Sequence, residues 1–366
     1  MSGAASAAGV RHPAPFQLAD KTVGRFLRAL VTPLLPADYL DLFHPLRKGA
    51  DLRGRVTAVE RHTRGATTVT IRPGRGWRGH RPGQYIRLGI EVDGVRLWRA
   101  YSVTSPITAA DGLITVTVRA IPDGKVSNHV LTGLRPGTLV MLDQATGDFV
   151  QPDTPPAKVL FLTAGSGITP VMGMLRNHRF RDAVLVHSCP DPSQMLFADE
   201  LRDRAASVEF RLVERFTTTA GTLTADRIAE EVPDWTDRQA WVCGPTGLLD
   251  DAEAHWDEAG LSNLLHVERF RPRIIAEGEG GDVTFTQSSV TVEASADAPL
   301  LDVGEDAGVL MPSGCRMGIC FNCVASLTSG AVRDLRTGET TQAIDEDPVL
   351  VQTCVSAAAG PCSIKL

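Results

Sequence analysis

Between residue 52 and about residue 150, apolar and β-branched residues alternate with polar ones in short runs separated by turn residues. Such alternation is typical of strands with one buried face, and the Asp93-Gly94 dipeptide between two runs is a hairpin signal. Many short strands with regular turns favour a closed antiparallel sheet. We therefore expect residues 51–155 to fold as an antiparallel β-barrel domain.

The pattern changes near residue 157, where continuous apolar runs begin to alternate with helical stretches. The run at 158–164 is followed by a glycine turn, and the run at 239–243 is followed by an amphipathic stretch at 248–260. Strands that alternate with helices predict a parallel sheet covered on both faces. Residues 156–272 are therefore expected to form an α/β domain.

Two further segments flank these domains. Residues 1–50 form an N-terminal extension, whose apolar stretch at 20–45 predicts partly helical structure. Residues 273–282 are rich in glycine and glutamate and predict a linker. The strand-like pattern resumes over residues 283–366, with one short helical stretch that ends at Gly308. We therefore expect a multidomain chain that ends in a third, smaller domain.

Four of the seven cysteines follow the spacing Cys-x4-Cys-x2-Cys and then, after 30 intervening residues, a fourth Cys. This is the spacing of plant-type ferredoxins, in which one tight loop supplies three thiolates and a distant strand supplies the fourth. A structural zinc site is the alternative, but zinc more often takes two ligands from each of two arms. The spacing therefore predicts a [2Fe–2S] cluster held by Cys315, Cys320, Cys323 and Cys354.

A second motif, Arg99-Ala100-Tyr101-Ser102, lies on an expected strand, where simple alternation could also explain it. Its chemistry fits a flavin, because a guanidinium binds phosphate through its planar fork. A tyrosine offers a flat face, and a serine hydroxyl can approach the flavin N5. Residues 124–127 follow at an expected strand-to-helix corner, whose N–H groups could bind a diphosphate. That corner favours FAD over FMN.

The α/β domain has a glycine-rich turn between its first strand and first helix. The turn contains Gly165, Gly167, Thr169 and Pro170. Its glycines allow a diphosphate to approach the backbone, and the helix N-terminus favours negative charge. Cys243-Gly244-Pro245 follows a later apolar run, at the strand end where open sheets bind ligands. Taken alone, this cysteine would be a small buried hydrophobe.

At these motifs the chain resembles two known families. Residues 280–366 resemble a plant-type ferredoxin domain through "PSGCRMGICFNC" and "VQTCVS", which implies an α+β β-grasp fold. Phe321 stands where that family often has a small residue. Residues 52–270 resemble the ferredoxin–NADP reductase superfamily through the Arg-x-Tyr-Ser and glycine motifs. One three-domain branch of that superfamily uses FMN, so FMN stays the alternative to FAD.

The resemblance to the reductase superfamily implies roles for individual residues. Cys243 would lie beside the nicotinamide, Phe270 would cover the flavin ring, and Glu268 would relay protons. Ser102 completes the expected catalytic set. The expected flavin contacts are Arg99, Tyr101, Ser102, Val103, Thr104, Gly124, Lys125, Val126 and Ser127. The expected nucleotide contacts are Gly165, Gly167, Thr169, Pro170, Cys243, Gly244 and Pro245.

The choice between NADPH and NADH stays open. A 2′-phosphate is usually bound by Arg or Lys after the second strand of the nucleotide domain. Residues 187–194 contain neither, and Arg215 is followed by Thr218 and Thr222, where relatives often have arginine. We therefore expect NAD(P)H without a preference.

These motifs together predict an oxidoreductase that passes electrons from NAD(P)H through FAD and [2Fe–2S] to a partner oxygenase or desaturase. The extension "LVTPLLPADYLDLFHPLRKGADLRG" resembles actinobacterial reductases that serve acyl-CoA desaturases, which are membrane di-iron enzymes. A cytochrome P450, a Rieske oxygenase and a di-iron monooxygenase are the alternative acceptors. A redox-sensing module is also open, whereas the 30-residue gap argues against the flavin and cluster subunit of a dihydroorotate dehydrogenase.

Charge and hydropathy add an expectation about surfaces and location. The net charge of -6 is uneven, because residues 276–366 carry -9 and residues 1–82 carry +9. The acidic end could meet a basic acceptor, and the basic start could contact anionic lipid at a membrane; solubility alone explains the asymmetry equally well. We expect no nucleic-acid partner. Without a long apolar run or a signal-peptide pattern, we expect a cytoplasmic protein, peripheral at most to a membrane.

Overall fold

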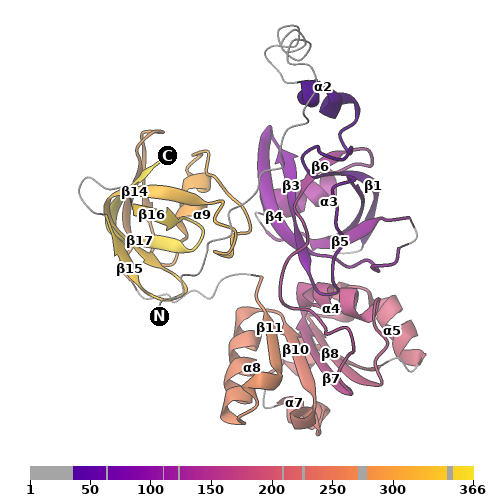
Figure 1. Cartoon of the computed structure of the whole chain (residues 1–366). Helices are drawn as coiled ribbons and strands as arrows, with labels where there is room; N and C mark the ends of the chain where they lie inside the picture. The colour runs from indigo at the N-terminus through magenta and orange to yellow at the C-terminus, as the bar shows by residue number, and fades with distance from the viewer. Residues whose placement is uncertain are drawn as a thin grey trace, which may run out of the picture.

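The computed structural model describes residues 36–62, 65–109, 111–122, 124–207, 210–224, 227–270, 278–343 and 349–366. Within these residues the chain forms three separate β-sheets with their own helices (Figure 1). The first is antiparallel, the second is parallel and the third is mixed. This arrangement confirms the expected fold class of a barrel, an α/β domain and an α+β domain.

The first sheet is a six-stranded antiparallel barrel in the order β4-β3-β6-β1-β2-β5. Its strands are β1 (Arg53–His62), β2 (Ala66–Pro73), β3 (Tyr85–Val92), β4 (Val95–Ser102), β5 (Ile114–Arg119) and β6 (Leu139–Leu142). A bridge between Val103 and Val116 joins the two edges of the sheet. Asp93 and Gly94 both have positive φ, as the tight β3–β4 hairpin requires. Helix α3 (Lys125–Thr132) packs Val126 and Val130 into the barrel core.

The second sheet is parallel, in the order β11-β10-β7-β8-β9. Its strands are β7 (Lys158–Ala164), β8 (Asp182–Cys189), β9 (Arg211–Phe216), β10 (Gln239–Cys243) and β11 (Leu265–Glu268). Alternate apolar residues of these strands enter two separate cores. Helices α4 (Ile168–Leu175) and α5 (Ala198–Ala206) cover one face, while α7 (Ile228–Glu231) and α8 (Thr246–Glu258) cover the other. A short helix, α6 (Thr217–Ala220), follows β9.

The third sheet has the order β13-β12-β17-β14-β15, and β16 also pairs with β14. Its strands are β12 (Gly281–Phe285), β13 (Val290–Ala294), β14 (Val324–Asp334), β15 (Thr340–Gln342), β16 (Val349–Gln352) and β17 (Ser356–Lys365). Helix α9 (Leu300–Asp306) packs Leu300 and Leu301 against it. Strand β12 already begins at Gly281, inside the segment expected to be a linker.

The structure describes only part of the N-terminal extension. Helix α2 (Pro36–Phe43) lies within the apolar stretch at 20–45, whereas residues 1–35 of the extension lie outside the described residues. Among the helices that the structure describes, none is long and apolar enough to cross a membrane.

Helix α4 joins the α/β domain to the barrel. The guanidinium of Arg176 donates to the Thr104 carbonyl at 2.7 Å, and Asn177 Oδ1 accepts from the Ile107 amide at 2.7 Å. A Cβ added at Gly173 would lie 2.5 Å from the Val103 carbonyl oxygen. Glycine therefore allows the helix to contact barrel backbone directly.

This contact predicts a stability effect. Gly173→Ala should destabilise the pair of domains by about 1–3 kcal/mol, because the new methyl group meets backbone that has little room to move. The matched control is Gly247→Ala in α8, where no atom lies within 4 Å of the new Cβ. That variant should keep or slightly raise the melting temperature, since alanine favours helix by up to about 1 kcal/mol. Equal melting temperatures for Gly173→Ala and wild type would show that the contact between α4 and the barrel accommodates the methyl group without loss of stability.

Candidate functional site

A cavity of about 160 Å³ lies where β4, β5 and the first turn of α4 meet. Tyr101 and Ser102 line it from β4, and Ser166 and Thr169 line it from the glycine turn. Ser102 Oγ is buried and has no hydrogen-bond partner among the described residues. A buried hydroxyl without a partner costs free energy, so this atom suits a bound polar group.

Glu268 and Phe270 reach the same cavity from the end of β11. Glu268 Oε2 is buried without a hydrogen-bond partner in the described chain, and burial raises the pKa of this carboxyl to about 8. Phe270 is 39% exposed at the cavity. The acid is therefore protonated at neutral pH and can donate a proton there.

Cys243 pairs with Glu268 in the parallel register of β10 and β11. Its side chain belongs to the apolar core beside α4, and burial, followed by the Glu268 charge, raises the pKa of its thiol well above the ordinary value. Cys243 therefore presents a neutral thiol next to the Glu268 carboxyl. Gly244 follows it, and Pro245 forms the N-cap of α8.

The glycine turn lies against the end of β10. Gly165 has φ +56, and a Cβ added at Gly167 would lie 2.0 Å from the Cys243 carbonyl oxygen. This close approach explains why glycine is needed at 167. Thr169 and Pro170 lie buried in the first turn of α4, and Thr169 Oγ1 donates to the Ser166 carbonyl at 3.0 Å.

The corner before α3 borders the cavity through Ile121. Gly124 is the N-cap residue, Lys125 is exposed and Val126 is buried. Ser127 Oγ donates to the Gly124 carbonyl at 3.2 Å and accepts from the Ile121 amide at 3.3 Å. These bonds fix the turn whose free N–H groups open the helix.

Three residues of the expected flavin motif do not line the cavity. Val103 is part of the barrel closure, and Thr104 Oγ1 bonds to Thr115 Oγ1 at 2.8 Å. Arg99 donates to the Trp98 carbonyl at 2.8 Å. Burial and then the nearby charge of Arg316 lower the pKa of Arg99.

Three of the motif cysteines lie in a loop of the third domain, which we call the cluster loop (residues 313–323), and Cys354 lies in the turn between β16 and β17. Cys323 Sγ and Cys354 Sγ are 3.2 Å apart, and Cys320 Sγ accepts from the Cys315 amide at 3.2 Å. The side chains of Cys315 and Cys320 also bond to each other, so the thiols form two pairs, Cys315 with Cys320 and Cys323 with Cys354. Two thiols per metal ion suit two irons bridged by sulfide. All seven cysteines of the chain are free thiols.

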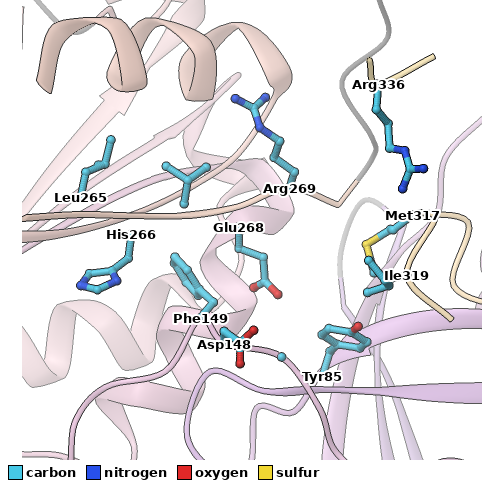
Figure 2. Close-up of a pocket in the computed structure, with 12 residues that line it drawn as sticks. Tyr85, Asp148, Phe149, Leu265, His266, Glu268, Arg269, Met317, Ile319 and Arg336 are labelled. Carbon is cyan, nitrogen blue, oxygen red and sulfur yellow. The ribbon is translucent and has the colours of Figure 1, made fainter. Parts of the chain in front are cut away.

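A larger cavity of about 630 Å³ lies between all three domains. Figure 2 shows the Glu268 carboxylate pointing into it, with Tyr85 and Asp148 from the barrel below. Met317 and Ile319 of the cluster loop line the cavity to the right of Glu268 in this view. Burial raises the pKa of Tyr85 to about 12, with the charge of Cys315 second. The larger cavity shares Tyr85, Glu268 and Met317 with the smaller one.

Comparison with known proteins agrees with this architecture. Residues 77–150 match the family of oxidoreductase FAD-binding domains, and residues 283–359 match the family of 2Fe-2S iron-sulfur cluster binding domains. Over 346 residues the chain is 47% identical to a protein named NADPH oxidoreductase from Mycobacterium tuberculosis, which covers 92% of this chain and 90% of that protein.

The chain belongs to the family of modular NAD(P)H oxidoreductases.

Two further comparisons extend this result. The oxidoreductase is 31% identical over 282 residues to NADH oxidoreductase HCR of Escherichia coli, covering 75% of this chain and 86% of that protein. Phthalate dioxygenase reductase shares the fold with a TM-score of 0.59 and 22% identity, covering 86% of this chain and 97% of that structure. The chain is thus an NAD(P)H-dependent flavoprotein with FAD and a [2Fe–2S] cluster.

The oxidoreductase has side chains that fit both resident groups. The unpartnered Ser102 Oγ and the flat ring of Tyr101 suit a flavin, and the two thiol pairs suit the cluster. The motifs do not indicate two residues near these sites, Met317 and Arg87. Met317 lies within the cysteine motif, so its closeness to the cluster could be foreseen. Its contact with the flavin pocket depends on domain orientation, which local patterns do not encode.

The cysteine assignment predicts a difference between two buried thiols of the same domain. Cys354→Ser should lower the iron content and remove the visible absorbance and electron paramagnetic resonance (EPR) signal of the cluster. Cys362→Ser is the matched control, because Cys362 is also buried but lies in the sheet opposite Val283. It should retain iron. Full iron in Cys354→Ser, or equal loss in both variants, would contradict the assignment.

Proposed function

We propose that this oxidoreductase takes hydride from NAD(P)H onto FAD and passes single electrons through its cluster to a partner oxygenase or desaturase. One observation carries the proposal. Met317 lines the cavity that contains Tyr101 and Ser102, while its amide donates to Cys315 Sγ at 3.3 Å. A single residue therefore contacts both redox sites. Flavin is needed between them because it accepts two electrons together and releases them singly.

The proposed roles come from the resemblance to the reductase superfamily, and the positions of the side chains support them. Tyr101 and the unpartnered Ser102 hydroxyl would hold the flavin in the smaller cavity. Phe270, which lines the same cavity, would cover the flavin ring until nicotinamide binds. Glu268 holds a proton beside the ring, and Cys243 packs next to it as a neutral thiol. The glycine turn at 165–167 and the α3 corner at 124–127 bind the diphosphates.

The acceptor class rests on relatives. Two of them are named glycine betaine monooxygenase reductase subunit (27% identical) and 3-ketosteroid-9-alpha-monooxygenase ferredoxin reductase component (31% identical). An acyl-CoA desaturase is the acceptor that the N-terminal extension favours, and both classes consume electrons one at a time at iron. Purified acceptors of both classes, tested in parallel for NAD(P)H-dependent product, would decide between them.

We also propose a peripheral membrane contact through the basic start of the chain. Leu42 and Phe43 of α2 are exposed, and Lys48 and Arg75 are exposed nearby, where the Arg75 amide donates to the Leu46 carbonyl at 2.9 Å. Apolar side chains beside cations suit an anionic lipid surface. Co-sedimentation with anionic but not neutral vesicles at low salt is the expected result.

The electron path predicts the order of spectral changes. When the anaerobic protein is mixed with NADPH or NADH, flavin absorbance should bleach first and cluster absorbance should follow. Met317→Ala should slow only the second phase, since it opens a gap between the two sites. A flavin that neither nucleotide bleaches would refute the proposed function.

The buried acid predicts a pH dependence. Because the pKa of Glu268 is raised to about 8, its carboxyl is neutral below that pH and charged above it. Hydride transfer adds negative charge to the flavin, so flavin bleaching should slow as pH rises through about 8. The expected loss is tenfold or more, since a unit charge beside the flavin costs on the order of 2 kcal/mol at an effective dielectric constant of about 20. Glu268→Gln, which cannot ionise, should lack this step in stopped-flow measurements.

A further inference from the structure

Strand β3 presents alternate side chains to the barrel core and to the ferredoxin domain. Ile86 and Leu88 are buried in the core. Tyr85 and Arg87 therefore point to the other side, as the period of a strand requires. Tyr85 lines the larger cavity with Met317, and the Arg87 guanidinium lies beside Asn322 of the cluster loop. The cluster loop thus contacts a short strip of β3.

The barrel holds Arg87 in a fixed position. Its guanidinium forms an ion pair with Asp143, just beyond β6, and its Cζ lies 5.8 Å from the ring centroid of Trp98. Only 17% of its side chain is exposed. A planar guanidinium held on two sides loses little further freedom when it bonds to a third group. Arg87 is therefore organised on the barrel before the cluster loop meets it.

The cluster loop is shaped to receive this guanidinium. In the amide orientation that satisfies both groups, Asn322 accepts from Arg87 Nη1 at 3.0 Å and donates to the Cys320 carbonyl at 3.0 Å. A Cβ added at Gly314 would lie 2.4 Å from Cys320 Sγ and 3.1 Å from Arg87 Nη1. Glycine leaves room for the guanidinium and the thiol together.

Two arginines near the cluster, Arg316 and Arg336, belong to the ferredoxin domain. Arg316 pairs with Asp302 and Glu305 on α9, and Arg336 pairs with Asp334 at 2.6 Å. These charges belong to the same domain as the cluster, so their distances to it do not depend on docking. Arg87 differs because it reaches the loop from the barrel, so its charge acts on the cluster only while the two domains are docked.

We propose that Arg87 is a positioning residue that docks the cluster loop on the flavin barrel and stabilises the reduced cluster by the charge it brings across the domain boundary. The proposal rests on the proposed function, in which electrons from NAD(P)H reach the cluster through FAD. One-electron reduction adds one negative charge to a group already surrounded by thiolates, so a cation beside the loop favours the reduced form. By linkage, reduction strengthens docking by the same factor.

The test compares Arg87→Leu with Arg96→Leu in the full-length protein loaded with FAD and cluster. Arg96 is the matched control, because it is exposed on the neighbouring strand β4. The midpoint potential of the cluster is read from its EPR signal during a mediated dithionite titration. Arg87→Leu should shift this potential to more negative values, whereas Arg96→Leu should leave it unchanged.

The second readout is the rate of cluster bleaching after NAD(P)H is added. Arg87→Leu should slow it about tenfold, as expected for loss of one charge-assisted hydrogen bond, and leave flavin bleaching unchanged. Arg87→Lys keeps the charge but loses the fork, so it should retain the potential and still slow bleaching. If Arg87→Leu binds too little iron for the measurement, the rate of cluster bleaching in Arg87→Lys tests whether Arg87 docks the cluster loop.

Three outcomes would overturn the proposal: a wild-type potential in Arg87→Leu, the same shift in Arg96→Leu, or wild-type cluster bleaching in Arg87→Lys. Failure of the proposed function looks different. In that case NAD(P)H would not bleach the flavin of the wild-type protein, while the dithionite titration would still report the effect of Arg87 on the cluster.

Discussion

Electrons cross a protein efficiently only over short distances, and one contact between domains sets that distance here. The cluster loop lies against the outer side of β3, where Met317 reaches the pocket that contains Tyr101. The inner side of the same strand supplies Ile86 and Leu88 to the barrel core. A shift of β3 by one residue would exchange the two sides. The register that closes the barrel therefore also positions the cluster.

The second constraint is the burial of an acid beside the reaction site. Glu268 ends β11, the edge strand of the nucleotide sheet, where it pairs with Cys243 of β10, and burial is the largest cause that raises the pKa of each group. Burial therefore keeps both the carboxyl and the thiol neutral. In the proposed function, this gives the site a proton donor without a negative charge that would oppose the arrival of hydride.

Local patterns were sufficient for the fold, and they predict the four cluster ligands. Alternation predicted the barrel, apolar runs followed by helical stretches predicted the parallel sheet, and the spacing of Cys315 to Cys354 matches the thiol pairs in the structure. Contacts between domains could not be predicted, because Arg87 occupies an ordinary outward position on a strand. Arg99 shows the same limit: its side chain lies near Arg316 of the cluster loop, and the phosphate contact that its motif indicates stays a prediction. The N-terminal extension stays a prediction up to residue 35.

The nucleotide sheet ends at Glu268 and the ferredoxin sheet begins at Gly281 of the same polypeptide. A covalent tether of this length converts an encounter between two proteins into an intramolecular one, with an effective concentration of roughly millimolar. Transfer from flavin to cluster then does not depend on how dilute the protein is. Each hydride supplies two electrons, and the cluster releases one per meeting with an acceptor. The second electron stays within the protein, so the next encounter with an acceptor does not require a further NAD(P)H.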